Sequence, residues 1–176
     1  MKIGIYGGTY NPPHTGHMQA AAEAVRLLKL DKLLLIPDRI APHKEIPTGS
    51  PTPEQRLEML RIAAAGHPEM EVSDIELKRE GKSYTADTVE QLRSLYPEDN
   101  LWLVMGTDML LRFDQIWRSY DEIARLADLA VVSRHEDDRA ALEEKAAHLR
   151  ETLGARIHLI EAPVIEISST ELREGE

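Results

Sequence analysis

Short apolar runs alternate with longer amphipathic stretches along the whole chain, and this alternation constrains the fold more than any other feature. Several of the short runs are apolar at successive positions, which is typical of strands buried on both faces of a parallel sheet. The runs predicted to be strands are residues 2–6, 33–37, 71–74, 101–105, 129–133 and 156–161. Because strands and helices alternate throughout, we predict an α/β fold with a doubly wound parallel sheet flanked by helices.

The stretches between the strands carry helix signals. Apolar faces at helical spacing are formed by Met18, Ala21, Ala22, Val25 and Leu28, and by Leu142, Ala146, Leu149 and Leu153. Capping boxes are predicted at 52–55, 119–122 and 168–171, where Ser or Thr is followed three residues later by Glu or Gln. At 52–55 a proline also occupies the first helical position.

Length and composition limit the classes of function. The 176 residues fit a single domain over residues 1–176, because domains usually contain ~100–200 residues. The 21 Lys and Arg against 31 Asp and Glu give a net charge of −10, which disfavours nucleic acid and anionic membranes as partners. The absence of cysteine excludes disulfides, thiolate metal ligands and cysteine nucleophiles, and it fits a reducing cytosol. With no signal-peptide pattern at its start, the chain is expected to be cytoplasmic.

The stretch GGTYNPPHTGH, residues 7–17, follows the first predicted strand and leads into a helix. Glycines at a strand end let a backbone approach a ligand, and the helix start adds N–H groups and a partial positive charge that suit phosphate. The stretch is neither a Walker loop nor the dinucleotide pattern G-x-G-x-x-G. It is distinguished by His14 and His17, since imidazoles there could bind phosphates and stabilise charge during group transfer.

Two structural alternatives stay open for this stretch. Gly7 and Gly8 alone could form an ordinary tight turn. His14 and His17 could be half of a zinc site, but the remaining ligands would have to come from carboxylates or from the other five of the seven histidines.

Residues 7–17 resemble the HxGH signature of the nucleotidyltransferase superfamily, and ISSTELR, residues 167–173, resembles its C-terminal motif. Four interior matches narrow the resemblance: PHK at 42–44, SYTADT at 83–88, GTD at 106–108, and Trp117. Together they are similar to the bacterial nicotinate-nucleotide adenylyltransferases, from residue 2 to residue 173. The resemblance implies a Rossmann-like fold and the transfer of the adenylyl group of ATP to nicotinate mononucleotide in NAD biosynthesis, with Mg²⁺ carried by ATP.

The resemblance also implies a role for each matching residue. The catalytic residues are His14, His17, Lys44 and Arg173. The ATP-binding residues are Gly7, Gly8, Thr9, His17, Gly106, Asp108, Arg134, Ser168, Ser169, Thr170 and Arg173. The acceptor-binding residues are Thr9, Tyr10, Asn11, Lys44, Tyr84, Thr85, Asp108 and Trp117.

Plainer roles remain open for several of these residues. Ser168 could be an ordinary helix cap, and so could Thr85. Trp117 could pack in the core instead of stacking on a pyridine ring. Asp108 could cap a helix instead of accepting a hydrogen bond from a ribose hydroxyl.

Other functions also remain open. The acceptor could be nicotinamide mononucleotide, phosphopantetheine or a cytidylyl acceptor, or the chain could bind nucleotides without catalysis. Two features depart from the resembled family: Tyr10 stands where Phe is common, and only three residues follow Arg173. The second departure leaves open whether the chain forms a homo-oligomer.

Overall fold

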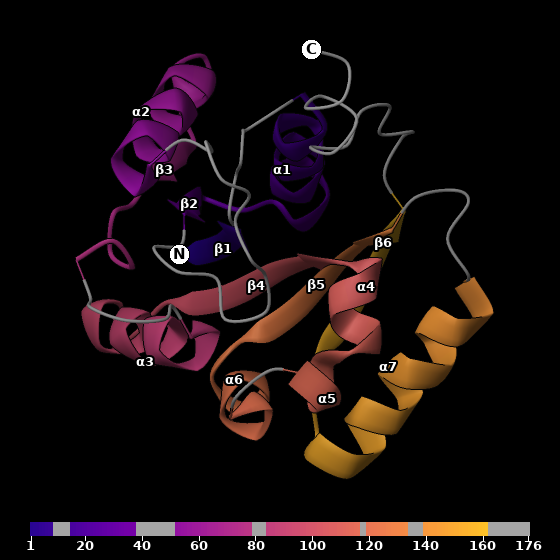
Figure 1. The fold of residues 1–176 in the computed structure, drawn as a ribbon. Helices are drawn as coiled ribbons and strands as arrows, with labels where there is room; N and C mark the ends of the chain where they lie inside the picture. The colour runs from indigo at the N-terminus through magenta and orange to yellow at the C-terminus, as the bar shows by residue number, and fades with distance from the viewer. Residues whose placement is uncertain (9–14, 38–51, 79–83, 117–118, 134–138, 162–176) are drawn as a thin grey trace.

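The six apolar runs form six strands of one parallel sheet, seen in the computed structural model in Figure 1. The structure describes residues 1–8, 15–37, 52–78, 84–116, 119–133 and 139–161. The strands are β1 (Lys2–Gly8), β2 (Lys32–Pro37), β3 (Met70–Val72), β4 (Asn100–Gly106), β5 (Asp128–Ser133) and β6 (Ile157–Glu161). The helices are α1 (Thr15–Leu28), α2 (Pro53–Ala64), α3 (Thr85–Leu95), α4 (Thr107–Leu111), α5 (Phe113–Ile116), α6 (Tyr120–Leu126) and α7 (Arg139–Leu153).

The strand order is β3-β2-β1-β4-β5-β6, and every neighbouring pair is parallel. The chain builds outward from β1 through β2 and β3, then returns to the other side of β1 with β4. This reversal between β1 and β4 is the topological switch point of a doubly wound sheet. The predicted fold class is therefore confirmed, and each predicted strand is present with bounds shifted by no more than two residues.

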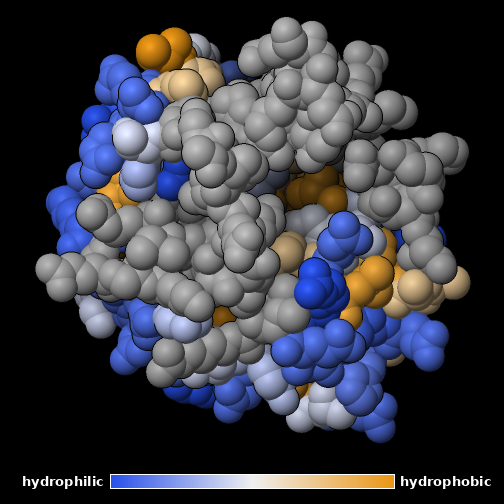
Figure 2. All heavy atoms as spheres, viewed as in Figure 1, coloured by the Kyte–Doolittle hydropathy of each residue, from blue (hydrophilic) through white to orange (hydrophobic). Residues whose placement is uncertain are grey.

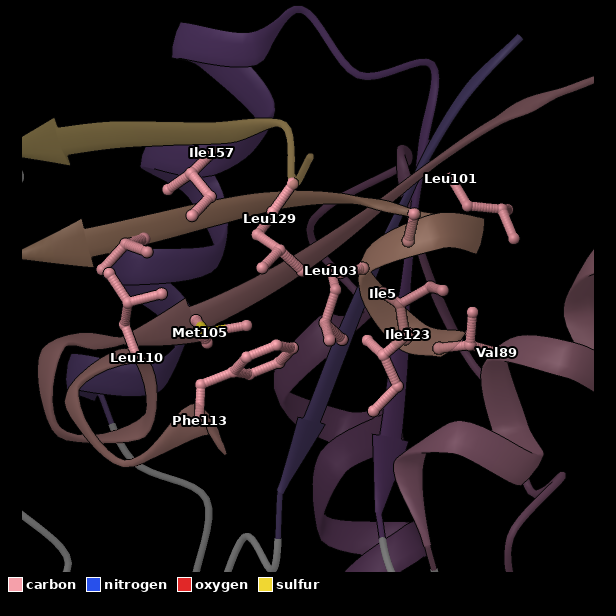
Figure 3. Close-up of a cluster of buried hydrophobic side chains, with 14 of the residues drawn as sticks. Ile5, Val89, Leu101, Leu103, Met105, Leu110, Phe113, Ile123, Leu129 and Ile157 are labelled. Carbon is pink, nitrogen blue, oxygen red and sulfur yellow. The ribbon is translucent and has the colours of Figure 1, made fainter. Parts of the chain in front are cut away.

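Helices cover both faces of the sheet: α1 and α2 lie on one face, and α3 to α7 lie on the other (Figure 1). The alternation of side chains along each strand supplies both interfaces. In β4, Leu103 and Met105 join the cluster that contains Phe113, whereas Trp102 and Val104 join the cluster beneath α1. Figure 3 shows the first of these clusters. Burial on both faces explains why the strands are apolar at successive positions.

The described part of the outer surface is largely polar (Figure 2). Hydrophilic side chains cover most of the described surface in the view of Figure 2. In the part of the chain that the structure describes, no helix is both long and apolar enough to cross a membrane.

The predicted helix faces are largely confirmed. In α7, Leu142, Ala146 and Leu149 are buried, and Leu153 is partly buried against the same cluster. In α1 the buried face is wider than predicted, because it also includes Ala20 and Ala24. The fully or nearly buried residues are Ala20, Ala21, Ala24 and Leu28, and the partly buried residues are Met18, Ala22 and Val25. Small alanine side chains let the helix approach the sheet closely, so the larger side chains lie at the margins of the contact.

The predicted capping box at the start of α2 is confirmed. The Gln55 backbone N–H donates to Thr52 Oγ1 at 3.1 Å, and the Thr52 N–H donates to Gln55 Oε1 at 2.8 Å. The box predicted at Ser119 is wrong, because Ser119 adopts a left-handed backbone (φ 55°, ψ 41°) and its side chain makes no capping hydrogen bond. A capping hydroxyl needs an extended backbone to reach the helix N–H groups. The third predicted box, at 168–171, lies outside the described residues.

The α2 capping box gives a direct test of local stability. Replacing Thr52 with Ala should lower the free energy of unfolding by about 1 kcal/mol, because one N–H group of the first turn loses its acceptor. Chemical denaturation measures this change. Thr52→Ser keeps the hydroxyl and serves as the control, so equal destabilisation by both substitutions would contradict the capping role.

Candidate functional site

The sheet divides at the carboxyl ends of its two central strands. The ladder between β1 and β4 ends at the pair Ile5 and Leu103, although both strands continue for three more residues. Over those residues β1 stays paired with β2 as far as Gly8, and β4 stays paired with β5 as far as Gly106. The central strands therefore separate at the switch point, where open α/β sheets bind their ligands.

Glycines occupy the two strand ends that face this separation, and the described packing does not require them. A Cβ built on Gly106 meets no described atom within 4 Å, and one on Gly7 meets only a backbone oxygen of β2 at 3.8 Å. In contrast, a Cβ on Gly4 would lie 2.6 Å from side-chain atoms of Leu30 and Leu33. Gly4 is thus a packing glycine, whereas Gly7 and Gly106 leave room for a molecule to approach the backbone.

A helix follows each of these two strands in the chain. α1 begins at Thr15 and contains His17 in its first turn, and α4 begins at Thr107 immediately after β4. Asp108 lies in the first turn of α4 with an exposed side chain, and Gly106 occupies the cap position. A capping role for Asp108 is therefore not observed, and its carboxylate can accept a hydrogen bond from a ligand.

The start of α3 lies at the same edge of the sheet, because α3 connects the end of β3 to the beginning of the parallel strand β4. The predicted helix start at Tyr84 and Thr85 is confirmed, but the alternative of Thr85 as the cap is wrong. Tyr84 has the extended backbone of a cap residue (φ −95°, ψ 130°), and Thr85 is the first residue of the helix. The Tyr84 side chain makes no capping hydrogen bond.

α5 is held firmly just before Trp117. Phe113 is fully buried and contacts the Tyr120 ring edge-on, with 6.1 Å between ring centroids. The Asp114 carboxylate accepts a hydrogen bond from Lys145 Nζ of α7 at 2.5 Å, and this contact lowers the pKa of Asp114. Sequence reasoning missed this pair, because its members are 31 residues apart and no local pattern joins them.

Many of the predicted site residues lie outside the described part of the chain. These are Thr9, Tyr10, Asn11, His14, Lys44, Trp117, Arg134, Ser168, Ser169, Thr170 and Arg173. The described backbone brings Gly7, Gly8, Gly106 and the start of α1 to the switch point, and it places the start of α3 at the same edge of the sheet. Roles for the side chains of His14, His17, Lys44 and Arg173 stay predictions.

Among the described ranges, no three His, Asp or Glu side chains come together in a group that could hold a metal ion. His14 of the zinc alternative lies outside those ranges.

Comparisons with known proteins agree with this geometry. The model of the family described as cytidylyltransferase-like matches residues 5–175. A probable nicotinate-nucleotide adenylyltransferase of Carboxydothermus hydrogenoformans is 39% identical over 98% of this chain and 85% of its own length. The corresponding protein of Oceanobacillus iheyensis is 38% identical over 98% of this chain and 83% of its own length.

A solved structure supports the fold. Plasmodium falciparum nicotinic acid mononucleotide adenylyltransferase complexed with NaAD has a TM-score of 0.76 at 18% identity, covering 98% of this chain and 82% of that one. A sheet that separates between β1 and β4, with helices starting at that edge, defines the nucleotide-binding α/β class. The chain belongs to the cytidylyltransferase-like family and, within it, to the nicotinate-nucleotide adenylyltransferases.

The Asp114–Lys145 pair predicts a pH-dependent contribution to stability. Because the pKa of Asp114 is lowered from its ordinary value of 3.8, the pair stabilises the folded state above that pH and loses its effect as the pH falls through the lowered value. Lys145→Met should therefore reduce the free energy of unfolding at pH 7 by at most about 1 kcal/mol. The difference in free energy of unfolding between the wild-type protein and Lys145→Met should become smaller below pH 3.8.

Urea denaturation of the wild-type protein and of Lys145→Met, at a series of pH values from 7 downward, measures this difference. Arg139→Met on the same helix is the control, since its pair with Glu143 is exposed on both sides and should contribute almost nothing. If the difference in free energy of unfolding between the wild-type protein and Lys145→Met does not change with pH, the charge pair with Asp114 does not stabilise α5.

Proposed function

We propose that this protein transfers the adenylyl group of ATP to nicotinate mononucleotide, yielding deamido-NAD and pyrophosphate, in NAD biosynthesis. The observation that carries the proposal is the separation of β1 and β4 between two open glycines. It creates a place at the sheet edge where a nucleotide can contact the backbone of both strands. The name of the relatives at 38% and 39% identity and the NaAD bound to the Plasmodium falciparum protein support the same reaction.

The reaction is a direct displacement at phosphorus. An oxygen of the acceptor's 5′-phosphate attacks the α-phosphorus of ATP, and the bond from that phosphorus to the bridging oxygen breaks. Pyrophosphate leaves with the bonding electron pair, and no covalent enzyme intermediate forms. Such a reaction requires mainly positioning of the reactants and stabilisation of charge.

We assign the charge-stabilising role to His14, His17, Lys44 and Arg173. The two histidines follow β1 at the start of α1, where helix N–H groups also favour phosphate. In the proposal, Lys44 reaches the reacting phosphates from its loop, and Arg173 binds the terminal phosphates of ATP. Mg²⁺ enters with the triphosphate as part of the substrate and offsets its negative charge.

We assign the remaining residues to the two substrates. The phosphates of ATP are approached by Gly7, Gly8 and Thr9. Its adenosine lies toward Gly106, Asp108 and Arg134. Its β- and γ-phosphates contact Ser168, Ser169 and Thr170. Thr9, Tyr10, Asn11, Lys44, Tyr84, Thr85, Asp108 and Trp117 contact the acceptor.

The start of α3 provides selectivity for the acceptor. Backbone N–H groups at Tyr84 and Thr85 and the partial positive charge of the helix start favour the carboxylate of nicotinate. The amide of nicotinamide has one acceptor oxygen and no charge, so it gains less from the same groups. The geometry therefore favours nicotinate mononucleotide over nicotinamide mononucleotide and over phosphopantetheine, which has no pyridine ring.

Pyrophosphate release from ATP tests the reaction and the acceptor together. We expect rapid release with nicotinate mononucleotide and a lower kcat/KM with nicotinamide mononucleotide and phosphopantetheine. Equal kcat/KM for the two pyridine mononucleotides would contradict the selectivity but leave the transfer reaction standing. ATP binding without pyrophosphate release with any acceptor would favour a non-catalytic nucleotide-binding protein.

The open glycine at the end of β4 predicts a separation of stability from activity. Gly106→Ala should leave the melting temperature unchanged, because no described atom lies within 4 Å of the new Cβ. The methyl group would occupy space that we assign to ATP, so kcat/KM for ATP should fall by about tenfold or more, as expected for ~1.4 kcal/mol of lost binding.

Gly4→Ala is the matched control in β1. Its Cβ would collide with two leucine side chains, so stability should fall by about 1–3 kcal/mol without a selective change in the KM for ATP. Normal ATP kinetics in Gly106→Ala would remove this glycine from the nucleotide site.

A further inference from the structure

A buried polar pair lies beneath the start of α3. Thr88 is the last residue of the 83–88 stretch, and Glu76 belongs to none of the motifs in the sequence. The Thr88 hydroxyl donates a hydrogen bond to Glu76 Oε2 at 2.7 Å. Thr88 is 1% exposed and Glu76 is 7% exposed, in a chain whose other described carboxylates are more exposed. Burying a carboxylate is unfavourable unless it is well bonded, so this pair calls for a physical reason.

Thr88 also touches the residue that caps the helix. Its backbone N–H donates to the Tyr84 carbonyl oxygen at 3.3 Å, and its hydroxyl oxygen lies 3.4 Å from that same carbonyl oxygen. A hydroxyl has one hydrogen to donate, and the contact with the carboxylate is the shorter one. The Thr88 hydrogen therefore goes to Glu76, and the 2.7 Å distance is close to that of charge-assisted O–H···O⁻ bonds. Thr88 thus connects Glu76 to Tyr84.

Glu76 in turn belongs to a segment tied to the sheet. The Ser73 N–H donates to the Leu35 carbonyl of β2 at 2.9 Å, which continues the β2–β3 ladder by one residue. The N–H groups of Leu77 and Lys78 both donate to the Asp74 carbonyl, at 2.9 and 3.2 Å, and close a tight turn around Glu76. Hydrogen bonds therefore tie this segment to β2 at one end and to the first turn of α3 at the other.

The apolar face of α3 is held by different contacts. Ala86, Val89 and Leu92 are buried in the core, and Figure 3 shows Val89 beside Ile123 of α6. Non-directional apolar packing sets the distance of a helix from its neighbours, but it tolerates small slides and rotations. A hydrogen bond with a fixed partner restricts these motions at the end of the helix where it acts.

We propose that Glu76 and Thr88 are positioning residues for acceptor recognition, because they hold the first N–H groups of α3 where the carboxylate of nicotinate can reach them. The inference rests on the proposed function, which assigns that carboxylate to Tyr84 and Thr85. Neither Glu76 nor Thr88 touches the substrate.

Thr88→Val tests the proposal, because valine has nearly the same shape and no donor. We expect the KM for nicotinate mononucleotide to rise by about fivefold to tenfold, the effect of one lost hydrogen bond, while the KM for ATP stays unchanged. The preference for nicotinate over nicotinamide mononucleotide should fall by a similar factor. Thr88→Ser, which keeps the hydroxyl, should restore both quantities.

Val89→Ala is the matched control on the next residue of the same helix. It removes buried apolar volume without touching the Glu76–Thr88 bond, so it should lower the melting temperature and leave both KM values and the acceptor preference unchanged. If Thr88→Val behaves like Val89→Ala, the pair is only structural and the proposal is overturned.

Two further measurements keep the outcome decisive. If the Thr88→Val protein does not fold, the Glu76→Gln protein is measured in its place. We expect its KM for nicotinate mononucleotide to be about twofold to threefold higher than that of the wild-type protein, because a neutral acceptor forms a weaker hydrogen bond with Thr88. An unchanged KM in Glu76→Gln overturns the proposal. The wild-type protein is assayed first: no dinucleotide from ATP and nicotinate mononucleotide would contradict the proposed function itself, whereas normal wild-type turnover with unaltered variants would contradict only the positioning role.

Discussion

The hydrogen-bond ladder between β1 and β4 ends at Ile5 and Leu103, and the rest of the candidate site depends on that ending. Each strand keeps its outer partner to its last residue, so the sheet opens without losing the pairing on either side. The opening lies between Gly7 and Gly106, neither of which is needed for the described packing. α4 begins directly after β4, α1 is the next helix after β1, and both begin at this edge of the parallel sheet with their free N–H groups. The interrupted ladder and the two helix starts therefore bring together, at one edge of the sheet, the space and the polar groups that the proposed nucleotide site requires.

Burial on both faces makes this edge a fixed platform. One cluster packs α1 and α2 against the sheet, and the other packs α3 to α7 against the opposite face. Directional contacts then set the positions of two elements that border the site. The Glu76–Thr88 bond fixes the start of α3, and the Asp114–Lys145 pair together with buried Phe113 fixes α5. Loops that carry chemistry are more effective when a rigid scaffold positions them, and these contacts supply that rigidity at α3 and α5.

The sequence predicted most features that depend on local patterns and fewer of those that depend on tertiary contacts. The strands and the capping box at Thr52 were predictable because apolar runs and cap residues act over a few positions. The box at Ser119 has the same residue pattern but a left-handed backbone, which tertiary context imposes. In α1 all the predicted residues pack against the core, but Ala20 and Ala24 are buried as well and were not predicted, because alanines give little contrast between faces. The end of the β1–β4 ladder and the Glu76–Thr88 bond could not be predicted, since each depends on the relative placement of separate elements. The motif at 7–17 predicted a helix start soon after the first strand, and α1 begins there at Thr15, because glycine, helix start and first strand are close in sequence. Its role as a site stays a prediction.

A titration of ¹⁵N-labelled protein with deamido-NAD, followed by two-dimensional NMR of the backbone amides, tests the central claim most directly. The dinucleotide carries the groups of both substrates, so it should contact both sides of the opening. We predict saturable shift changes concentrated at Gly7, Gly8, Gly106 and Thr85, with little change at the amino ends of the same strands, such as Lys2 and Asn100. Shift changes centred on those amino ends, or on the outer faces of α2 and α7, would contradict the assignment of the separated strand ends as the nucleotide site.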